Sequence, residues 1–328
     1  MAAEVAIVAV GAFLSSGASA QRAPGTAGAA YPAKPVRIIV GVAPGGATDA
    51  QARMFSQRLS DSLGHPFVVD NRLGAGGLLG FNTVASATPD GYTLLATSPS
   101  LTTVQAFQAK PAYDPVKDFA PISLVTRAPY LVVAHPSFAA KTMSELIAYA
   151  RSRPDAVNFG LSGMGSIYHL GAAWISSTAQ VKMALIPYKG VGPALTDLLT
   201  GQIHVTFANP TNVVGHVKSG RLRALAVTSA GRSRVFPELQ TVAESGVPGF
   251  NVTSWQGWLA PKATSAAIVH RLSTELARFV NSQEIAERLA ADGGEPVGST
   301  PEQFRQLIVS ESARWRQLVK ETGMRADE

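Results

Sequence analysis

Cysteine is absent from this chain of 328 residues, and charged side chains make up only 15% of it. The absence of cysteine excludes disulfides, iron–sulfur clusters, thiol catalysis and zinc ribbons. Lys and Arg outnumber Asp and Glu by 28 to 22, yet they form no long cluster. A protein that reads nucleic acid would gather its basic residues on one stripe. The composition therefore favours a protein that handles small anions, without a nucleic-acid partner.

Sites for metals and cofactors are equally poorly supported. The six histidines are scattered, with no H-x-x-x-H pair and no carboxylate at a ligand spacing. Nothing else in the sequence supplies a cofactor motif, so we predict neither a metal nor a cofactor.

The N-terminus resembles an export signal. An apolar run at 5–14 is followed by Ala18-Ser19-Ala20, which is typical of a signal peptide that ends at residue 20. The run is shorter than the ~18–20 apolar residues that a membrane span needs. Glu4 stands where a positive charge is usual, which indicates a true start codon further upstream. We expect 1–20 to be a signal peptide, 21–30 a linker of small residues, and the mature protein to be periplasmic.

The rest of the chain alternates between short apolar strands and helical patterns, as parallel βαβ units do. One series of such units begins near Tyr31, and a second runs from 131 to 226. A strand at 254–259, containing Trp255 and Trp258, returns the chain to the first series. We therefore expect an α/β protein with two doubly wound domains around a cleft. The predicted domains are 31–126 plus 253–328, and 127–252.

Glycine-rich loops follow several predicted strands, at the edge where open α/β sheets bind ligands. The first, Gly41–Thr48, has the spacing of a Walker A loop, but Ala47 replaces the lysine that would offset phosphate charge. Nucleotide hydrolysis is therefore not expected. What is left is an anion cradle at a helix start, capped by Thr48 or Asp49, or else only a tight turn.

The second glycine loop, 71–80, has Leu79 where a dinucleotide fingerprint needs glycine. We reject a Rossmann cofactor site there. Close packing of a helix on a strand explains these glycines, and a contribution to the ligand cleft is the alternative.

The third glycine loop, 160–166, allows two interpretations. A hydrolase would use Ser162 or Ser166 as nucleophile and His169 as base, but Met164 breaks the G-x-S-x-G elbow. In the interpretation we prefer, Ser166 caps a helix whose free N–H groups face a carboxylate.

Several stretches resemble one family along nearly the whole mature chain. They are 31–37 (YPAKPVR), 44–49 (PGGATD), 70–77 (DNRLGAGG), 89–94 (PDGYTL), 113–121 (YDPVKDFAP), 186–190 (IPYKG), 220–227 (GRLRALAV) and 295–298 (EPVG). The sequence resembles the Bug family, the periplasmic solute receptors of tripartite tricarboxylate transporters. The resemblance implies a type II periplasmic-binding-protein fold whose two domains close over a carboxylated ligand.

The same resemblance implies a set of ligand-binding residues and a role. The first domain would contribute Ala43, Gly45, Gly46, Thr48, Asp49, Thr97 and Ser98, and the second Ser162, Gly165, Ser166, Asn209 and His169. The protein would be a non-enzymatic monomer that binds a di- or tricarboxylate or an aromatic acid. It would deliver this ligand to a membrane permease, with a sensor kinase as the alternative partner.

Two features depart from the family pattern. Gly41-Val42 replace a Pro-Phe pair, which removes an aromatic lid and widens the expected site. Ala208 stands where many relatives have an acid suited to an ammonium group, so an α-amino acid is a less expected ligand.

Overall fold

The computed structural model describes residues 31–108, 110–233, 235–291 and 293–324. The predicted signal peptide (1–20) and linker (21–30) lie outside the described residues. Within the described ranges, no helix is both long enough and apolar enough to cross a membrane.

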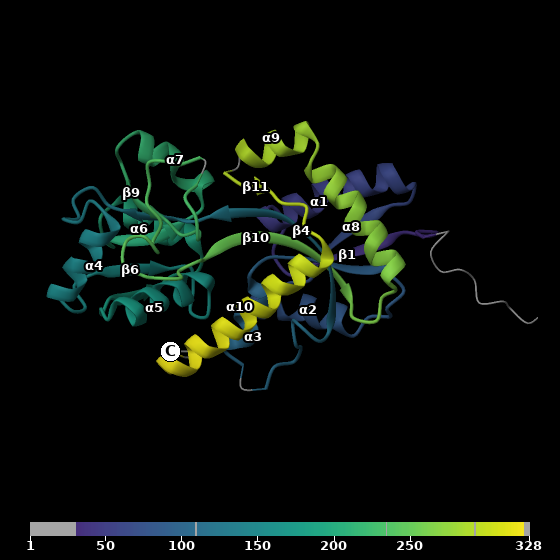
Figure 1. The fold of residues 1–328 in the computed structure, drawn as a ribbon, viewed down its shortest axis with the longest axis horizontal. Helices are drawn as coiled ribbons and strands as arrows, with labels where there is room; N and C mark the ends of the chain where they lie inside the picture. Colours follow the sequence, from purple (N-terminus) through teal and green to yellow (C-terminus); the bar gives the residue numbers. More distant parts are fainter. Residues whose placement is uncertain (1–30, 109, 234, 292, 325–328) are drawn as a thin grey trace, which may run out of the picture.

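The chain forms two lobes, each built around a β-sheet (Figure 1). The sheet of the first lobe has the order β11-β4-β10-β3-β1-β2. Its strands are β1 (Val36–Val40), β2 (Phe67–Asn71), β3 (Thr93–Thr97), β4 (Phe119–Pro129), β10 (Thr253–Pro261) and β11 (Glu295–Pro296). The associated helices are α1 (Ala47–Leu63), η1 (Ala75–Gly77), α2 (Leu78–Ala85), α3 (Ser100–Ala106), α8 (Ala266–Val280), α9 (Gln283–Ala291) and α10 (Pro301–Thr322).

The sheet of the second lobe has the order β7-β6-β8-β5-β9. Its strands are β5 (Leu131–Ala134), β6 (Asn158–Leu161), β7 (Ala184–Pro187), β8 (Val205–Ala208) and β9 (Arg223–Val227). Its helices are α4 (Met143–Ser152), α5 (Ile167–Ala179), α6 (Val191–Leu199) and α7 (Pro210–Lys218). The expected α/β fold with two sheets is confirmed.

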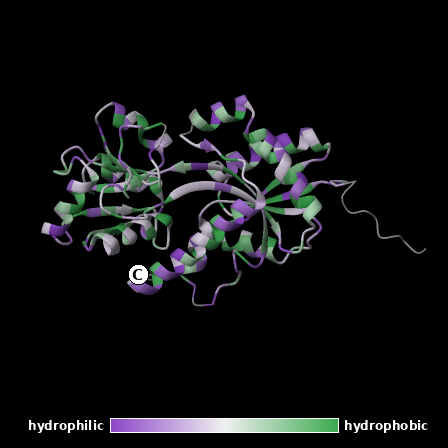
Figure 2. Cartoon of the chain, viewed as in Figure 1, coloured by the Kyte–Doolittle hydropathy of each residue, from purple (hydrophilic) through white to green (hydrophobic). Residues whose placement is uncertain are grey.

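Strand β1 shows why the first series reads as continuous apolar runs. It pairs in parallel with both β2 and β3, so it lies inside the sheet. Ile38 packs in the core on one face, and Ile39 packs in the core on the other. A strand covered on both faces is apolar along most of its length, and in β1 four of the five residues are buried while Arg37 is exposed. Figure 2 shows that hydrophobic residues occur on strands and helices of both lobes, interspersed with hydrophilic ones.

The two lobes are joined by extended chain and by one helix. The chain passes from β4 into β5 at Tyr130 and returns to the first sheet at the start of β10 (Figure 1). Helix α10 contributes Phe304 and Ile308 to a core of the first lobe. Further along it, Trp315 and Leu318 lie in the main core of the second lobe. The predicted domain boundaries stay a prediction, but α10 packs in both cores.

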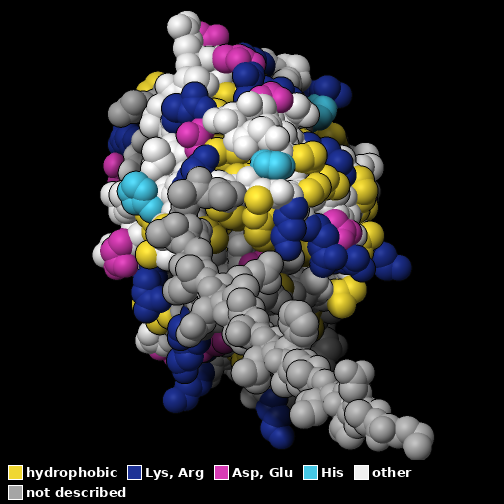
Figure 3. Space-filling view, turned by 90° about the vertical axis from the view of Figure 1, so that its right-hand side faces the viewer, with side chains coloured by type: hydrophobic (Ala, Val, Ile, Leu, Met, Phe, Trp, Pro, Cys, Tyr) yellow, Lys and Arg dark blue, Asp and Glu magenta, His cyan; other side chains and the backbone are white. Residues whose placement is uncertain are grey.

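The charged surface of the first lobe is mixed. Figure 3 shows the face on the right of Figure 1, where Lys and Arg side chains are scattered among acidic and uncharged ones. On the part of this face that grey atoms leave visible, the positive charge therefore forms no continuous stripe of the kind that binds nucleic acid.

Gly257 on β10 provides a test of the packing between β10 and α10. A Cβ at this position would overlap the ring of Phe304. We expect Gly257→Ala to lower the free energy of unfolding by about 1–3 kcal/mol, the usual cost of overpacking a core. Gly192→Ala is the control, because nothing lies within 4 Å of its Cβ. Urea unfolding should show a lower midpoint for the first variant only, and equal midpoints would contradict the close approach.

Candidate functional site

Two adjoining cavities lie between the lobes and form one cleft. The first has a volume of about 420 Å³ and the second about 460 Å³. Four residues line both of them, namely Ala47, Asn209, Ser254 and Gln256. Each cavity falls within the size range of small-molecule sites.

Three helices begin at this cleft. Helix α1 starts after Gly46, and α7 starts after Asn209, and in the described chain neither start is capped by a side-chain hydrogen bond. Helix α5 starts after Ser166, whose hydroxyl accepts a hydrogen bond from the His169 N–H at 3.3 Å. The first N–H groups of a helix have no partner within the helix, and the helix dipole makes this end favourable for anions. The cleft therefore presents N–H donors from both lobes.

Gly45 permits the first of these helix starts. Its φ of +88° lies in the left-handed region, which side chains with a Cβ rarely adopt. The turn before α1 therefore depends on a glycine at this position.

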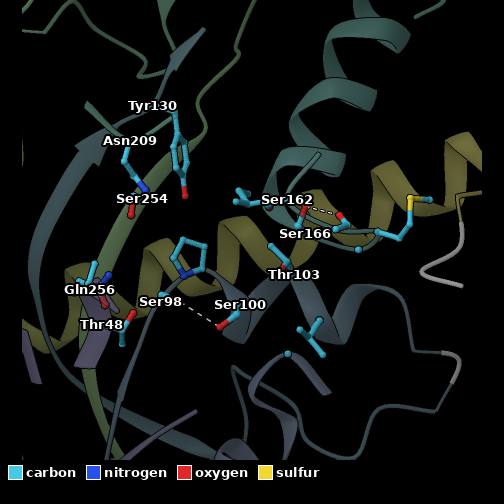
Figure 4. A pocket seen from close by; sticks show the side chains of 18 residues that line it. Thr48, Ser98, Ser100, Thr103, Tyr130, Ser162, Ser166, Asn209, Ser254 and Gln256 are labelled. Atoms are coloured by element: carbon cyan, nitrogen blue, oxygen red, sulfur yellow. Dashed lines mark hydrogen bonds between the residues drawn. The ribbon is translucent and has the colours of Figure 1, made fainter. Parts of the chain in front are cut away.

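Hydroxyl and amide side chains complete the walls of the cleft (Figure 4). Ser98, Ser100 and Thr103 reach it from α3 and the loop before it, and Ser162 and Ser166 reach it from the loop before α5. These side chains can donate and accept hydrogen bonds.

Tyr130, Ser254 and Gln256 line the cleft from the strands that join the lobes (Figure 4). Burial raises the pKa of Tyr130 to about 12, so the phenol is neutral at physiological pH. Gln256 is 7% exposed, and its Oε1 has no hydrogen-bond partner in the part of the chain that the structure describes. Ligand groups that donate a hydrogen bond can satisfy this oxygen.

None of the described residues that line the two cavities is Asp, Glu, Lys, Arg or His. A bound anion would therefore be held by N–H and O–H dipoles and not by an ion pair. Across the described residues, no three His, Asp or Glu side chains lie close enough to hold a metal ion.

The structure brings eight of the twelve predicted residues to the cleft. Those lining the first cavity are Thr48, Ser98, Ser162, Gly165, Ser166 and Asn209, and Gly45 and Gly46 line the second. The four that line neither cavity are Ala43, Asp49, Thr97 and His169. The part that any of them plays in binding stays a prediction.

Asp49 has a structural role in place of the expected capping role. The cap residue of α1 is Gly46, and Asp49 is 2% exposed. Its carboxylate accepts hydrogen bonds from the Gly45 N–H at 2.9 Å, from Asn71 at 2.9 Å and from Arg53 at 3.0 Å. These donors, Arg53 first, lower the pKa of Asp49 to about 2. Asp49 therefore fixes the glycine loop from behind.

His169 does not pair with either candidate serine. Its Nδ1 accepts the Gly165 N–H at 3.2 Å, and its ring stacks on Phe107. The Ser166 hydroxyl donates to the Gly163 carbonyl at 2.6 Å and contacts only the backbone N–H of His169. Burial lowers the pKa of His169. The hydrolase interpretation needs a serine within hydrogen-bond reach of the imidazole, and this arrangement does not provide one.

Sequence reasoning missed the polar residues Gln51, Thr126, Thr211 and Asn212, which line only the second cavity. It also missed five polar residues of the first cavity, namely Ser100, Thr103, Tyr130, Ser254 and Gln256. None of these five follows a glycine loop, which was the signal we used. Ser254 and Gln256 alternate with Trp255 and Gly257 along β10. Polar side chains at alternate positions of an otherwise apolar strand are the signal that would have located them.

The glycines of the second loop serve close packing, one of the two readings left open. A Cβ on Gly41 would lie 2.8 Å from the Cα of Gly77, and one on Gly80 would lie 3.2 Å from the Cα of Gly41. Helix α2 therefore approaches the end of β1 more closely than larger residues allow. Gly76 of the same loop also lines the first cavity.

Residues 51–324 match the model of a protein family described as "Tripartite tricarboxylate transporter family receptor". The chain belongs to this receptor family. The match spans both lobes, from α1 to the end of α10. The resemblance noted from the sequence motifs is therefore confirmed.

Individual members of the receptor family are similar over nearly the whole chain. BugT of Bordetella pertussis is 40% identical over 295 residues, which cover 89% of this chain and 90% of BugT. An R. palustris protein solved with adipate is 35% identical with a TM-score of 0.77, covering 90% of this chain and 99% of its own. MatC from Rhodopseudomonas palustris, with bound malate, is 33% identical with a TM-score of 0.74. The match covers 88% of this chain and 100% of the MatC chain.

The role of Asp49 can be tested through acid stability. Its lowered pKa means that it stabilises the fold above about pH 4 and that this contribution is lost as the pH falls toward about 2. We expect Asp49→Asn to lower the free energy of unfolding by about 1–2 kcal/mol at neutral pH and by less at pH ~3. Asp61→Asn, an exposed position on the same helix, is the control. If Asp49→Asn lowered the free energy of unfolding equally at both pH values, the stabilising role of the ionised Asp49 carboxylate would be contradicted.

Proposed function

We propose that this receptor captures a small dicarboxylate in the cleft between its lobes and delivers it to a membrane permease. The observation that carries the proposal is an uncharged cleft at which three helices begin, two of them without a side-chain cap. Two similar receptors hold adipate and malate, which are both dicarboxylates. The cleft here offers donors from opposite walls, which suits a ligand with a carboxylate at each end.

In this proposal each carboxylate meets a different helix start. One lies against the N–H groups that follow Gly46 at the start of α1, and the other against the Ser162–Ser166 loop at the start of α5. Thr48 and Gln256 lie together on one wall (Figure 4) and would contact the middle of the ligand. Ala208, at the end of β8, supplies no acid for an ammonium group. The proposed ligand class is therefore a dicarboxylate without an amino group.

Closure of the lobes would retain the ligand. The Tyr130 link between β4 and β5 and the start of β10 are the natural hinge segments, since the chain crosses between the lobes there. A ligand that contacts both walls favours the closed state by its difference in affinity for the two states. The domains 31–126 plus 253–328 and 127–252 are the bodies proposed to move.

We place this event in the periplasm, after removal of residues 1–20. Similar solved structures include one described as a periplasmic transporter. The receptor would act as a monomer, would make or break no covalent bond, and would present its closed form to the permease. A sensor kinase is the alternative partner.

Binding can be tested with a block inside the cleft. Ala47 is exposed and lines both cavities, so Ala47→Trp should fill the cleft without disturbing a core. We expect adipate or malate at a hundredfold excess over Kd to stabilise the wild type by about 2.7 kcal/mol, seen as a higher Tm. The shift should vanish in Ala47→Trp.

The matched control is Gln57→Trp, which places the same side chain at an exposed position on the same helix. This variant should keep the full shift. The proposed function is contradicted if a panel of di- and tricarboxylates and aromatic acids gives the wild type no shift. A shift that persists in Ala47→Trp would place the ligand elsewhere.

The hydrolase alternative makes the opposite prediction for catalysis. We expect no turnover of small esters or amides by the wild type, because the imidazole of His169 already accepts the Gly165 N–H. A chromogenic ester assay of the wild type, Ser162→Ala and Ser166→Ala checks this. If the wild type hydrolysed the ester and either substitution abolished this activity, the protein would be a hydrolase, and the proposal of a receptor without catalysis would be wrong.

A further inference from the structure

Glu311 is a buried carboxyl group that does not line the cleft. It lies on α10, between the part of the helix that packs in the first lobe and the part that packs in the second. The residue is 5% exposed. The Thr102 hydroxyl lies 3.0 Å from Oε2, and the indole N–H of Trp255 donates to Oε1 at 3.1 Å. This single carboxyl group therefore ties α10 to α3 and to β10.

Both partners of Glu311 support walls of the cleft. Thr102 is on the short helix α3, whose first turn supplies Ser100 and Thr103 to the first cavity. Trp255 lies on β10 between Ser254 and Gln256, which line both cavities. Glu311 therefore contacts one residue of α3 and one residue of β10, and each of these elements also supplies lining residues of the cleft.

The Thr102 hydroxyl has two acceptors and only one proton. Its oxygen lies 3.0 Å from the Pro99 carbonyl and 3.0 Å from Oε2 of Glu311. When Glu311 is ionised, the hydroxyl donates to the carboxylate. When Glu311 holds a proton on Oε2, this O–H donates to the threonine oxygen, and the threonine proton turns to the Pro99 carbonyl. The Pro99 carbonyl also accepts the backbone N–H groups of Thr102 and Thr103 at 3.0 Å, so the protonation state decides whether the Thr102 hydroxyl adds a third hydrogen bond to this lining residue.

The surroundings of Glu311 place its titration near neutrality. Burial raises the pKa of Glu311 to about 7, against the opposing effects of the Thr102 and Trp255 donors. Two guanidinium groups also oppose the rise, Arg314 on the same helix and Arg127 on β4. The phenol of Tyr130 faces Glu311 as well and is neutral in this range.

We propose that Glu311 is a positioning residue through which proton uptake strengthens ligand binding in the cleft. The proton comes from water and binds Oε2, which releases the threonine hydroxyl to the Pro99 carbonyl and removes a buried negative charge from behind the site. This proposal rests on the proposed function, because the negative charge of Glu311 can oppose binding only if the ligand in the cleft is an anion. By linkage, a carboxylate ligand must in turn favour the protonated form of Glu311.

The first experiment needs no ligand. We expect the indole ¹H–¹⁵N resonance of Trp255, assigned by its loss in Trp255→Phe, to titrate with a midpoint near pH 7. This titration should be absent in Glu311→Gln, whose amide stays neutral. Thr102→Val should raise the midpoint, because the carboxylate loses one donor. Glu302→Gln, at an exposed position on the same helix, should leave it unchanged.

The second experiment measures affinity by calorimetry, with adipate as the probe and malate as the second probe. Between about pH 6 and pH 8 we expect the Kd of the wild type to rise several-fold, up to the tenfold change that corresponds to one pKa unit. Glu311→Gln should bind with a Kd that stays nearly constant, close to the low-pH value of the wild type. Glu302→Gln should follow the wild type.

Each failure has a distinct meaning. The proposal is overturned if the Trp255 resonance does not titrate, if it titrates in Glu311→Gln, or if Glu311→Gln keeps the slope of the wild-type Kd. If Glu311→Gln does not fold, Thr102→Val takes its place, and an unchanged midpoint in this variant overturns the proposal. Failure of every carboxylate to bind at any pH contradicts the proposed function itself. The indole titration then still decides whether a proton on Glu311 repositions its partners.

Discussion

The N–H groups at the starts of α1, α5 and α7 are the feature on which the rest of the cleft depends. A helix start without a full set of partners is costly to bury unless water or a ligand satisfies it. Here three helices start at one cleft, although α7 begins with Pro210, which has no N–H, and the described lining residues carry no charge that could satisfy the N–H groups. The glycine at 45 makes the turn before α1, and Asp49 fixes this turn from the protein side. The cleft therefore suits an anion that brings its own charge.

Two crossings of extended chain and one helix connect the lobes. The crossings lie near Tyr130 and at the start of β10, and they are the hinge segments in the proposed closure. Helix α10, in contrast, is packed into both cores. Any closure must therefore be accommodated where α10 crosses between them, and Glu311 is buried there with partners on two walls of the cleft. The carboxyl group of Glu311 therefore connects the helix that packs in both lobes to two elements, α3 and β10, that line the cleft.

Local sequence signals predicted the parts of this protein that depend on local physics. The β-branched residues of Val36–Val40 favour a strand and form β1, and Ser166 was correctly predicted to cap α5. Contacts between distant segments were not predictable in this way. Asp49 lies in the first turn of its helix and looks like a cap until Asn71 and Arg53 are seen to hold it. The polar positions of β10, and the pairing of Glu311 with α3, likewise arise only from tertiary packing.

Mapping the backbone amides of the receptor during titration with malate tests the central claim most directly. The account predicts that the ¹H–¹⁵N resonances of Ala47 and Thr48 at the start of α1, and of Ile167 and Tyr168 at the start of α5, shift most, because these first-turn N–H groups meet the two carboxylates. Saturable shifts at both helix starts would support this arrangement. Binding of malate with shifts at only one start, or at residues outside the cleft, would contradict it.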